Sequence, residues 1–237
     1  MLSIEIRNVS YHYEPSDKKI LDNLNFRIEY GEKVVLLGSN GCGKTTLLKV
    51  LCGLYQPVEG QILVNGGVVK STPSFNFLVG FVPENPTEMF FESTVEREIE
   101  FILKQKKLSK EERVVKVEGI LKKFGLSKLK DRTPFELSAG EKRKLAIAAN
   151  IVAEQEFILL DEPTADLDWA GVEAVENFIR ESECGIMATT HRTDFANTFD
   201  RIVLMNNGHI VKDNVDLVKD CRLLYDVGVV VLKRLDI

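Results

Sequence analysis

Residues 38–45 read "GSNGCGKT", a glycine-rich loop between two hydrophobic segments of different character. The preceding "KVVLLG" is short, β-branched and unalternating, which predicts a strand buried on both faces. The following "KTTLLKVLCGL" predicts a helix with one apolar face, because its leucines recur at helical spacing. Those apolar positions are Leu47, Leu48, Leu51 and Leu54. Ordering so flexible a loop loses conformational entropy, so something bound there must offset the loss.

The loop fits the pattern G-x-x-x-x-G-K-[ST], which binds phosphate groups when it joins a strand to a helix. Its glycines let backbone N–H groups point inward at phosphate oxygens, and the helix start adds a partial positive charge. Lys44 is expected to reach the β- and γ-phosphates, and Thr45 to offer its hydroxyl to Mg²⁺. The predicted nucleotide-binding residues of the loop are Gly38, Ser39, Asn40, Gly41, Cys42, Gly43, Lys44, Thr45 and Thr46. A glycine turn with an exposed lysine is the alternative, but the flanking strand and helix favour phosphate binding.

The stretch "FILLDEP" supplies two carboxylates at the end of a second buried strand. Asp161 emerges where the apolar run ends and can orient a magnesium ion. Glu162 follows and is placed to accept a proton from an attacking water. An Asp-Glu pair is weak evidence alone, because acidic residues often begin loops. Together with the phosphate loop it indicates nucleotide hydrolysis.

Residues 137–148, "LSAGEKRKLAIA", narrow the kind of nucleotide enzyme. They resemble the LSGGQ signature of ATP-binding-cassette ATPases, and all the motifs follow in that family's order. The resemblance implies ATP and Mg²⁺ as cofactors and a second ATPase subunit as partner. In the family, two subunits meet head to tail, so Ser138 and the amides around Gly140 are expected to cap the partner's γ-phosphate.

Other residues match the family one by one. Tyr13 corresponds to the aromatic residue that stacks on adenine, although Tyr11 competes for that role. "ADLD" resembles the D-loop, which would place Asp168 at the subunit interface. His191 in "ATTH", at the end of the predicted strand "GIMATT", matches the switch histidine, a donor to the γ-phosphate. The predicted catalytic residues are therefore Glu162, His191 and Lys44.

The resemblance implies an α/β fold: a P-loop NTPase (RecA-like) core, an N-terminal antiparallel β subdomain and an inserted α-helical subdomain. Residues 1–85 and 155–213 are predicted to form the nucleotide-binding core with its β subdomain. There "EGQILVNGG" predicts a strand that ends in an Asn-Gly turn. Residues 86–154, rich in amphipathic helical pattern, are predicted to form the signature subdomain. Within it, Ser109 followed by Glu112 predicts a capping box at the start of a helix. The apolar stripe of that helix is predicted to comprise Val114, Val117, Ile120, Leu121 and Phe124. The remaining segment, 214–237, is a C-terminal extension whose one evident feature is the apolar run "VGVVVL", and the pattern assigns it no role.

Within the family, "ENPTEMFFESTVEREIEF" looks like the corresponding stretch of energy-coupling-factor ATPases, which drive uptake of vitamins and metal ions. This likeness predicts integral membrane subunits that dock near residues 84–100. Two positions depart from the family. Glu84 replaces the Q-loop glutamine and would still coordinate magnesium, with Thr45 and Asp161, while adding negative charge. Glu141 replaces the last glutamine of the signature.

These carboxylates leave the oligomeric form open. Glu84 and Glu141 would oppose closure of a homodimer on a polyanionic nucleotide, which favours a heterodimer with a partner that carries glutamines. The alternative is that glutamate replaces glutamine without consequence, because either can coordinate magnesium through an oxygen.

Composition constrains the partners further. The formal net charge of −5 gives no sign of a nucleic-acid-binding face, so no nucleic acid is expected. No apolar run approaches the ~18 residues that span a bilayer, so we expect a peripheral subunit at the cytoplasmic face of the cell membrane. The competing function is a soluble, non-transport cassette ATPase in repair or cofactor assembly.

Overall fold

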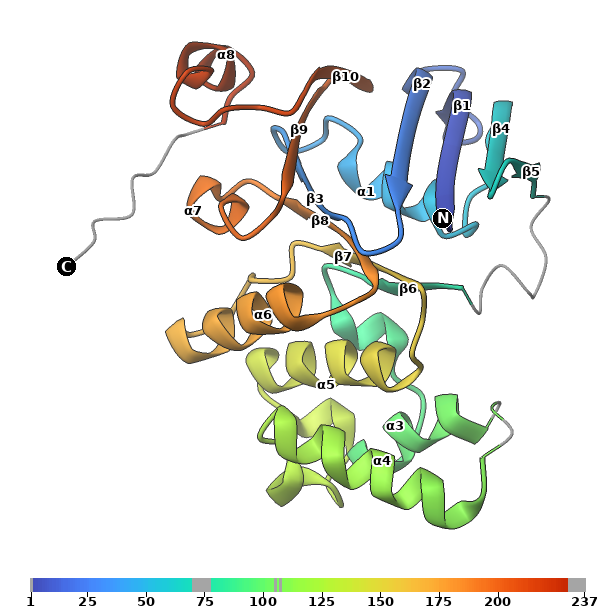
Figure 1. Cartoon of the computed structure of the whole chain (residues 1–237), viewed down its shortest axis with the longest axis vertical. Helices are drawn as coiled ribbons and strands as arrows, with labels where there is room; N and C mark the ends of the chain where they lie inside the picture. The colour runs from blue at the N-terminus through green and yellow to red at the C-terminus, as the bar shows by residue number, and fades with distance from the viewer. Residues whose placement is uncertain (1, 70–77, 105, 107, 230–237) are drawn as a thin grey trace. The chain divides into compact units, whose positions relative to one another are not determined.

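The computed structural model describes residues 2–69, 78–104, 106 and 108–229, and Figure 1 shows its elements. The chain divides into two compact units. The first, here called the sheet unit, comprises Met1–Phe81, Glu156–Glu162 and Phe178–Ile237. The second, the helical unit, comprises Val82–Gln155 and Pro163–Asn177. The domain boundaries expected from the sequence stay a prediction. No helix among the described residues is long and apolar enough to cross a membrane.

The sheet unit holds an antiparallel sheet in the order β2-β1-β4-β5. Its strands are β1 (Ser3–His12), β2 (Lys19–Glu29), β4 (Glu59–Val64) and β5 (Gly67–Val68). Apolar residues alternate along β1 and β2, so one face of each strand is buried and the other is polar. The predicted Asn-Gly turn is confirmed: Asn65 and Gly66 both have positive φ and join β4 to β5.

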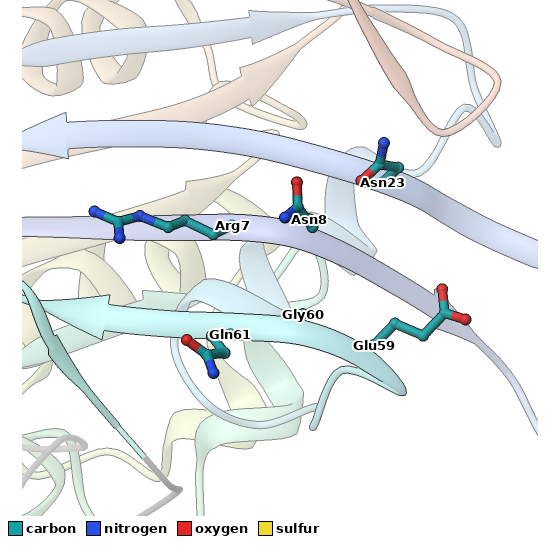
Figure 2. Close-up of a pocket in the computed structure, with 6 residues that line it drawn as sticks. All are labelled: Arg7, Asn8, Asn23, Glu59, Gly60 and Gln61. Carbon is teal, nitrogen blue, oxygen red and sulfur yellow. The ribbon is translucent and has the colours of Figure 1, made fainter.

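This sheet has a polar hollow where β1 and β4 lose their regular pairing (Figure 2). It is lined by Arg7, Asn8, Asn23, Glu59, Gly60 and Gln61. The register shifts between Arg7 and Ser10, and Asn8 has a φ of 52°. The hollow therefore follows from a β-bulge, which bends the strand and spreads its neighbours.

A second, mostly parallel sheet carries the order β10-β9-β3-β8-β7-β6. Its strands are β3 (Lys33–Leu37), β6 (Val79–Val82), β7 (Phe157–Asp161), β8 (Gly185–Thr190), β9 (Arg201–Asn206) and β10 (His209–Asp213). The central strands β3, β7 and β8 are buried along their whole length, as the apolar runs of β3 and β7 predict. Since β8 pairs in parallel with both β3 and β7, the carboxyl ends of these three strands meet at one edge.

Helix α1 (Lys44–Leu51) begins directly after the glycine loop and contacts β7 and β2. Its apolar residues Leu47, Leu48 and Leu51 are fully buried in the sheet unit's core. The expectation that Leu54 continues this face is wrong. The helix is capped at Cys52, so Leu54 lies beyond it with 61% of its surface exposed.

The helical unit is built around α5 (Ala139–Val152), which contacts α3 (Val95–Lys104) and α4 (Lys110–Lys123), as Figure 1 shows. The predicted capping box of α4 is confirmed, with reciprocal bonds between Ser109 and Glu112. The unit also holds the 3-10 turns η1 (Pro86–Met89), η2 (Ser127–Leu129) and η3 (Pro134–Glu136).

The apolar stripe predicted for α4 is correct at four of its five positions. Val117, Ile120, Leu121 and Phe124 are buried. Val114 is 45% exposed instead, because the first turns of α4 extend beyond the part of the helix that its neighbours cover.

Three further helices complete the described chain: α6 (Trp169–Glu181), α7 (Thr193–Ala196) and α8 (Cys221–Asp226). Helix α8 lies in the segment to which the sequence assigned no role. Its one buried helical side chain is Leu224. The apolar run "VGVVVL" noted in that segment continues past Val229 into residues outside the described range.

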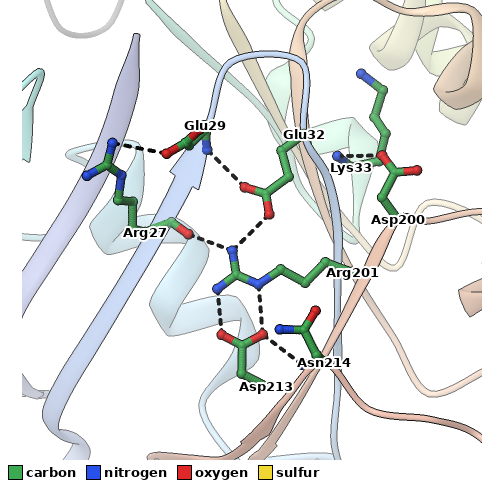
Figure 3. Close-up of polar contacts among 8 residues, drawn as sticks. All are labelled: Arg27, Glu29, Glu32, Lys33, Asp200, Arg201, Asp213 and Asn214. Carbon is green, nitrogen blue, oxygen red and sulfur yellow. Dashed lines mark hydrogen bonds and ion pairs between the residues drawn. The ribbon is translucent and has the colours of Figure 1, made fainter. Parts of the chain in front are cut away.

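A charged cluster links β9 and β10 to β2 and the turn that follows it (Figure 3). The Arg201 guanidinium donates to Asp213 at 2.6 and 2.7 Å and to Glu32 at 2.9 Å. It also donates to the backbone carbonyl of Arg27 at 3.0 Å and lies 5.1 Å from the Phe26 ring centre. The bonds from Arg201 lower the pKa of the Asp213 carboxyl, so the folded state favours its ionised form.

Replacing Arg201 by methionine should lower the free energy of unfolding by about 1–3 kcal/mol, because two carboxylates and a carbonyl lose a charged donor. Asp213 has a depressed pKa, so its contribution is present above the unfolded carboxyl pKa of about 4 and is lost as the pH falls through the folded value. Urea unfolding at pH 7 and pH 3 should therefore show a smaller difference between variant and parent in acid.

The matched control is Arg7→Met. Arg7 also pairs with a carboxylate, that of Glu5, but its side chain is 54% exposed and the pair is screened by water, so its loss should be smaller than that of Arg201. Equal losses for the two variants would contradict the role given to the Arg201 cluster.

Candidate functional site

The glycine loop joins β3 to α1, and its lysine is folded back onto it. Lys44 is buried, and its ammonium donates to the carbonyls of Gly38 and Ser39 at 2.8 and 3.1 Å. Gly43 has a φ of 107°, and a Cβ there would lie 2.9 Å from Met205. At Gly38 a Cβ would lie 2.4 Å from the Met205 carbonyl. Two of the glycines are thus required by the fold of the loop, independently of any ligand.

The other loop residues divide by exposure. Asn40 and Gly41 are exposed, whereas the Cys42 side chain is buried, and burial raises the pKa of its thiol. The Cys42 N–H donates to the Ser39 carbonyl at 3.3 Å. Cys42 therefore turns its side chain into the protein, and its predicted contact with nucleotide stays a prediction.

Behind the loop, a buried chain of hydrogen bonds connects three elements of the sheet unit. The Thr45 hydroxyl, in the first turn of α1, donates to Asp161 Oδ2 at 2.7 Å. From β8, the Thr189 hydroxyl donates to Asp161 Oδ1 at 2.5 Å and accepts the N–H of Glu162 at 3.0 Å. Both oxygens of Asp161 are thereby oriented, and the backbone of Glu162 is held in place.

Glu162 and His191 face each other at the ends of β7 and β8. The His191 Nδ1 lies 3.2 Å from each carboxylate oxygen of Glu162. The Glu162 side chain is only 12% exposed, whereas that of His191 is 62% exposed. Glu162 also has a φ of 45°, a left-handed conformation that is uncommon for a side-chain-bearing residue and is often found at functional sites.

The residues that meet at Thr45 fit a magnesium ion. Mg²⁺ prefers oxygen ligands and is usually held by one or two carboxylates together with substrate phosphates and water. The Thr45 hydroxyl and the Asp161 carboxylate are oxygen donors within 2.7 Å of each other, beside a loop suited to phosphate. No cluster of three or more His, Cys, Asp or Glu side chains that could hold a metal occurs among the described residues.

The two candidate base-stacking residues differ in exposure. Tyr13 is 40% exposed, and its hydroxyl lies 2.8 Å from that of Thr46 in α1. Tyr11 is stacked on Tyr55, and burial raises the pKa of its phenol. Tyr13 therefore has the more open ring and lies next to the phosphate loop, which favours it over Tyr11 as the base-binding residue.

In the helical unit, the signature residues begin α5. The Ser138 hydroxyl accepts the N–H of Glu141 at 3.3 Å, and the Glu141 carboxylate accepts the N–H and the hydroxyl of Ser138 at 2.8 and 2.9 Å. These bonds lower the pKa of the Glu141 carboxyl. Glu141 is therefore an anion bonded to the start of its own helix, where a phosphate was expected.

Glu84 and Asp168 also lie in the helical unit. Glu84 is exposed, and its backbone carbonyl accepts a bond from Arg143 of α5 at 2.5 Å. The Asp168 carboxylate accepts the N–H of Gly171 at 2.8 Å and so begins α6. Because the two units are described separately, the roles of Glu84 at magnesium and of Ser138 and Gly140 at a partner's nucleotide stay predictions.

Comparison with known proteins gives the family. The model of the ABC transporter family matches residues 21–165, more than half of the chain. The chain belongs to the ABC transporter family. Like other members of this family, it is an ATP-hydrolysing subunit of a transporter. The fold class predicted from the sequence is confirmed.

An energy-coupling factor transporter ATP-binding protein from Clostridium perfringens is 36% identical over 246 residues, covering 97% of this chain and 86% of that protein. Another, from Enterococcus faecium, is 34% identical and covers 89% of this chain and 78% of that protein. The solved structure of cbiO1 from Clostridium perfringens, part of the transporter complex cbiONQ, has a TM-score of 0.79, with 27% identity, and covers 95% and 94% of the two chains.

Sequence reasoning missed Thr189. It was read only as part of the strand "GIMATT", where a threonine is typical of β-structure. Nothing in the local pattern distinguishes it from Thr190, because its contacts come from β7, which lies 28 residues earlier in the chain.

Thr189→Val should lower magnesium-dependent ATP hydrolysis by roughly 10–100-fold, a typical loss for a residue that orients a metal ligand. The substitution keeps the shape of the side chain but removes the donor to Asp161 and the acceptor for the Glu162 N–H. Steady-state hydrolysis against magnesium concentration measures the effect.

Thr190→Val is the matched control. Thr190 is equally buried on the same strand, but its hydroxyl accepts the N–H of Arg192 instead. It should retain most of the activity. Full hydrolysis by the Thr189 variant at low magnesium would contradict the positioning role.

Proposed function

We propose that this subunit binds MgATP with the loop residues Gly38–Thr46 and uses closure of an ATPase dimer to drive uptake of a vitamin or a metal ion. The observation that supports ATP hydrolysis most directly is the meeting of Thr45, Asp161 and Glu162 at one edge of the parallel sheet. Uptake is supported by the energy-coupling factor relatives, which cover most of the chain.

In the proposed reaction, Lys44 leaves the carbonyls it now contacts and binds the β- and γ-phosphates. Thr45 and Asp161 would hold a magnesium ion, which when bound would neutralise charge that develops on the phosphate oxygens. Glu162 accepts the proton of the attacking water. His191 donates to the γ-phosphate, and its contact with Glu162 orients the ring for this.

ATPases of this family form dimers, and a cassette solved as a dimer with ADP and phosphate has the same fold, at a TM-score of 0.80. For this chain we place Ser138, Gly140 and Asp168 at the dimer interface. The partner is a second ATPase subunit, either another copy or a related chain.

The membrane subunits are proposed to dock near residues 84–100, with this chain peripheral at the cytoplasmic face of the membrane. Phe91 in that segment is 60% exposed and makes an edge-to-face contact with Phe101, at 4.5 Å between ring centres. The buried Glu98 carboxylate accepts the N–H groups of Phe91 and Glu92 at 3.1 and 2.8 Å. An exposed aromatic side chain on a braced loop is suited to binding an apolar groove of a partner.

Glu162→Gln should abolish ATP hydrolysis while MgATP binding persists, because the amide keeps the size of the side chain but cannot accept the proton. General base catalysis contributes about 10²–10⁴ in rate. In cells that carry the variant as their only copy, uptake of one compound in a panel of labelled vitamins and divalent metal ions should be lost.

Glu156→Gln, at the residue that precedes β7 and so at the end opposite Glu162, is the control for this experiment and should leave hydrolysis and uptake unchanged. Undiminished turnover in the Glu162 variant would refute its catalytic role. Loss of hydrolysis with every uptake unchanged would favour the competing function, a non-transport ATPase of repair or cofactor assembly.

A second experiment concerns the two glutamates that replace glutamine. We expect slow hydrolysis by the purified chain alone, and faster hydrolysis by Glu84→Gln and by Glu84→Gln/Glu141→Gln, because each change removes a negative charge from the proposed composite site. In the double variant, the amide oxygen of the new side chain can still accept a bond from the helix start that Glu141 now caps. Single-turnover and steady-state hydrolysis measure the change.

Glu112→Gln controls for the altered helix cap, since Glu112 holds the same capping position in α4. It should not change turnover. Fast, cooperative hydrolysis by the unmodified chain alone would instead support a homodimer in which glutamate replaces glutamine without consequence.

A further inference from the structure

Three tyrosines form a compact ring cluster beside the phosphate loop. The rings of Tyr11 and Tyr55 are stacked, with centres 5.1 Å apart and planes 1° from parallel. Tyr13 stands perpendicular to both, at 5.2 Å from Tyr11 and 5.7 Å from Tyr55. Stacked and edge-to-face contacts are the favoured geometries of aromatic pairs, so each ring restricts the other two.

Tyr13 is held by three contacts although it is 40% exposed. Its ring meets Tyr11 and Tyr55 at right angles, and its hydroxyl bonds that of Thr46. An exposed aromatic side chain ordinarily rotates about its side-chain bonds. Here three contacts hold the ring while part of its surface stays open.

Tyr55 is the tyrosine of the cluster that follows α1, the helix after the phosphate loop. Its N–H donates to the Lys49 carbonyl at 3.0 Å. The Lys49 ammonium lies 5.4 Å from the centre of the Tyr55 ring. Since α1 begins at Lys44, Tyr55 connects the ring cluster to the helix whose first turn is proposed to meet the phosphates.

We infer that Tyr55 is a positioning residue for the base of the nucleotide: it holds the Tyr13 ring in the orientation that stacks on a purine. This inference rests on the proposed function of Tyr13 as the base-stacking residue. A ring already held in place loses little rotamer freedom when the base binds, so affinity for the base rises without a direct contact from Tyr55. The flat apolar face also accepts any purine, because stacking reads no hydrogen-bond pattern.

The test compares the binding of MgATP with that of magnesium tripolyphosphate, which has the phosphates but no base. Tyr55→Leu should weaken ATP binding by about three- to tenfold, the loss of one aromatic contact set. Its affinity for tripolyphosphate should stay at the parent value. Tyr55→Phe keeps the stacked and edge contacts and should bind both ligands as the parent does. Isothermal titration calorimetry gives both dissociation constants, and the melting temperature of each variant reports its folding.

Equal weakening of ATP and tripolyphosphate by Tyr55→Leu would overturn the inference, because it would mean that Tyr55 only supports α1. Unchanged affinity for both ligands would also overturn it. Tyr55→Phe keeps the test decisive if the leucine variant fails to fold, since a loss of ATP affinity in the phenylalanine variant contradicts a role that rests on ring contacts. Tyr13→Leu tests the proposed function of Tyr13 separately from the inference about Tyr55. If it leaves ATP affinity unchanged, the proposed role of Tyr13 itself fails.

Discussion

The hydrogen bond from the Thr45 hydroxyl to Asp161 joins residues 116 positions apart, and the candidate site depends on it. It is possible because β3, β8 and β7 are parallel neighbours whose carboxyl ends meet at one edge. A phosphate loop after β3, a carboxylate at the end of β7 and a histidine after β8 are thereby gathered from three distant segments. Thr189, fully buried between them, bonds both Asp161 and the backbone of Glu162.

Two polar side chains of the candidate site have partners within the sheet unit. The Lys44 ammonium donates to two carbonyls of its own loop, and the Glu162 carboxylate is in contact with His191. Leaving the buried ammonium of Lys44 without a partner would be unfavourable, so its loop supplies one. In the proposed reaction Lys44 exchanges these carbonyls for phosphate oxygens, which makes the protein's own contacts part of the binding equilibrium.

The N-terminal antiparallel sheet contributes to the candidate site through its aromatic residues. Tyr13 follows β1, and the ring cluster with Tyr11 and Tyr55 holds it beside Thr46. Farther along the sheet, Arg201 joins β9 to β10, to β2 and to the turn after β2 through two carboxylates and a carbonyl. The strands that present the aromatic rings and those that carry the loop are in this way held within one unit.

The sequence by itself determined the family, the fold class, the buried strands and the order of the motifs. These features follow from apolar runs and glycine spacing, which lie within short stretches of the chain. It also predicted the Asn65-Gly66 turn and the α4 capping box, whose causes span a few residues. It was wrong at Leu54 and Val114, since helix length and neighbouring elements decide which side chains are covered. Only the tertiary structure showed the role of Thr189, the inward-facing Cys42, the self-capped Glu141 and the ring cluster. Each depends on hydrogen bonds, packing or rotamers that periodicity does not encode.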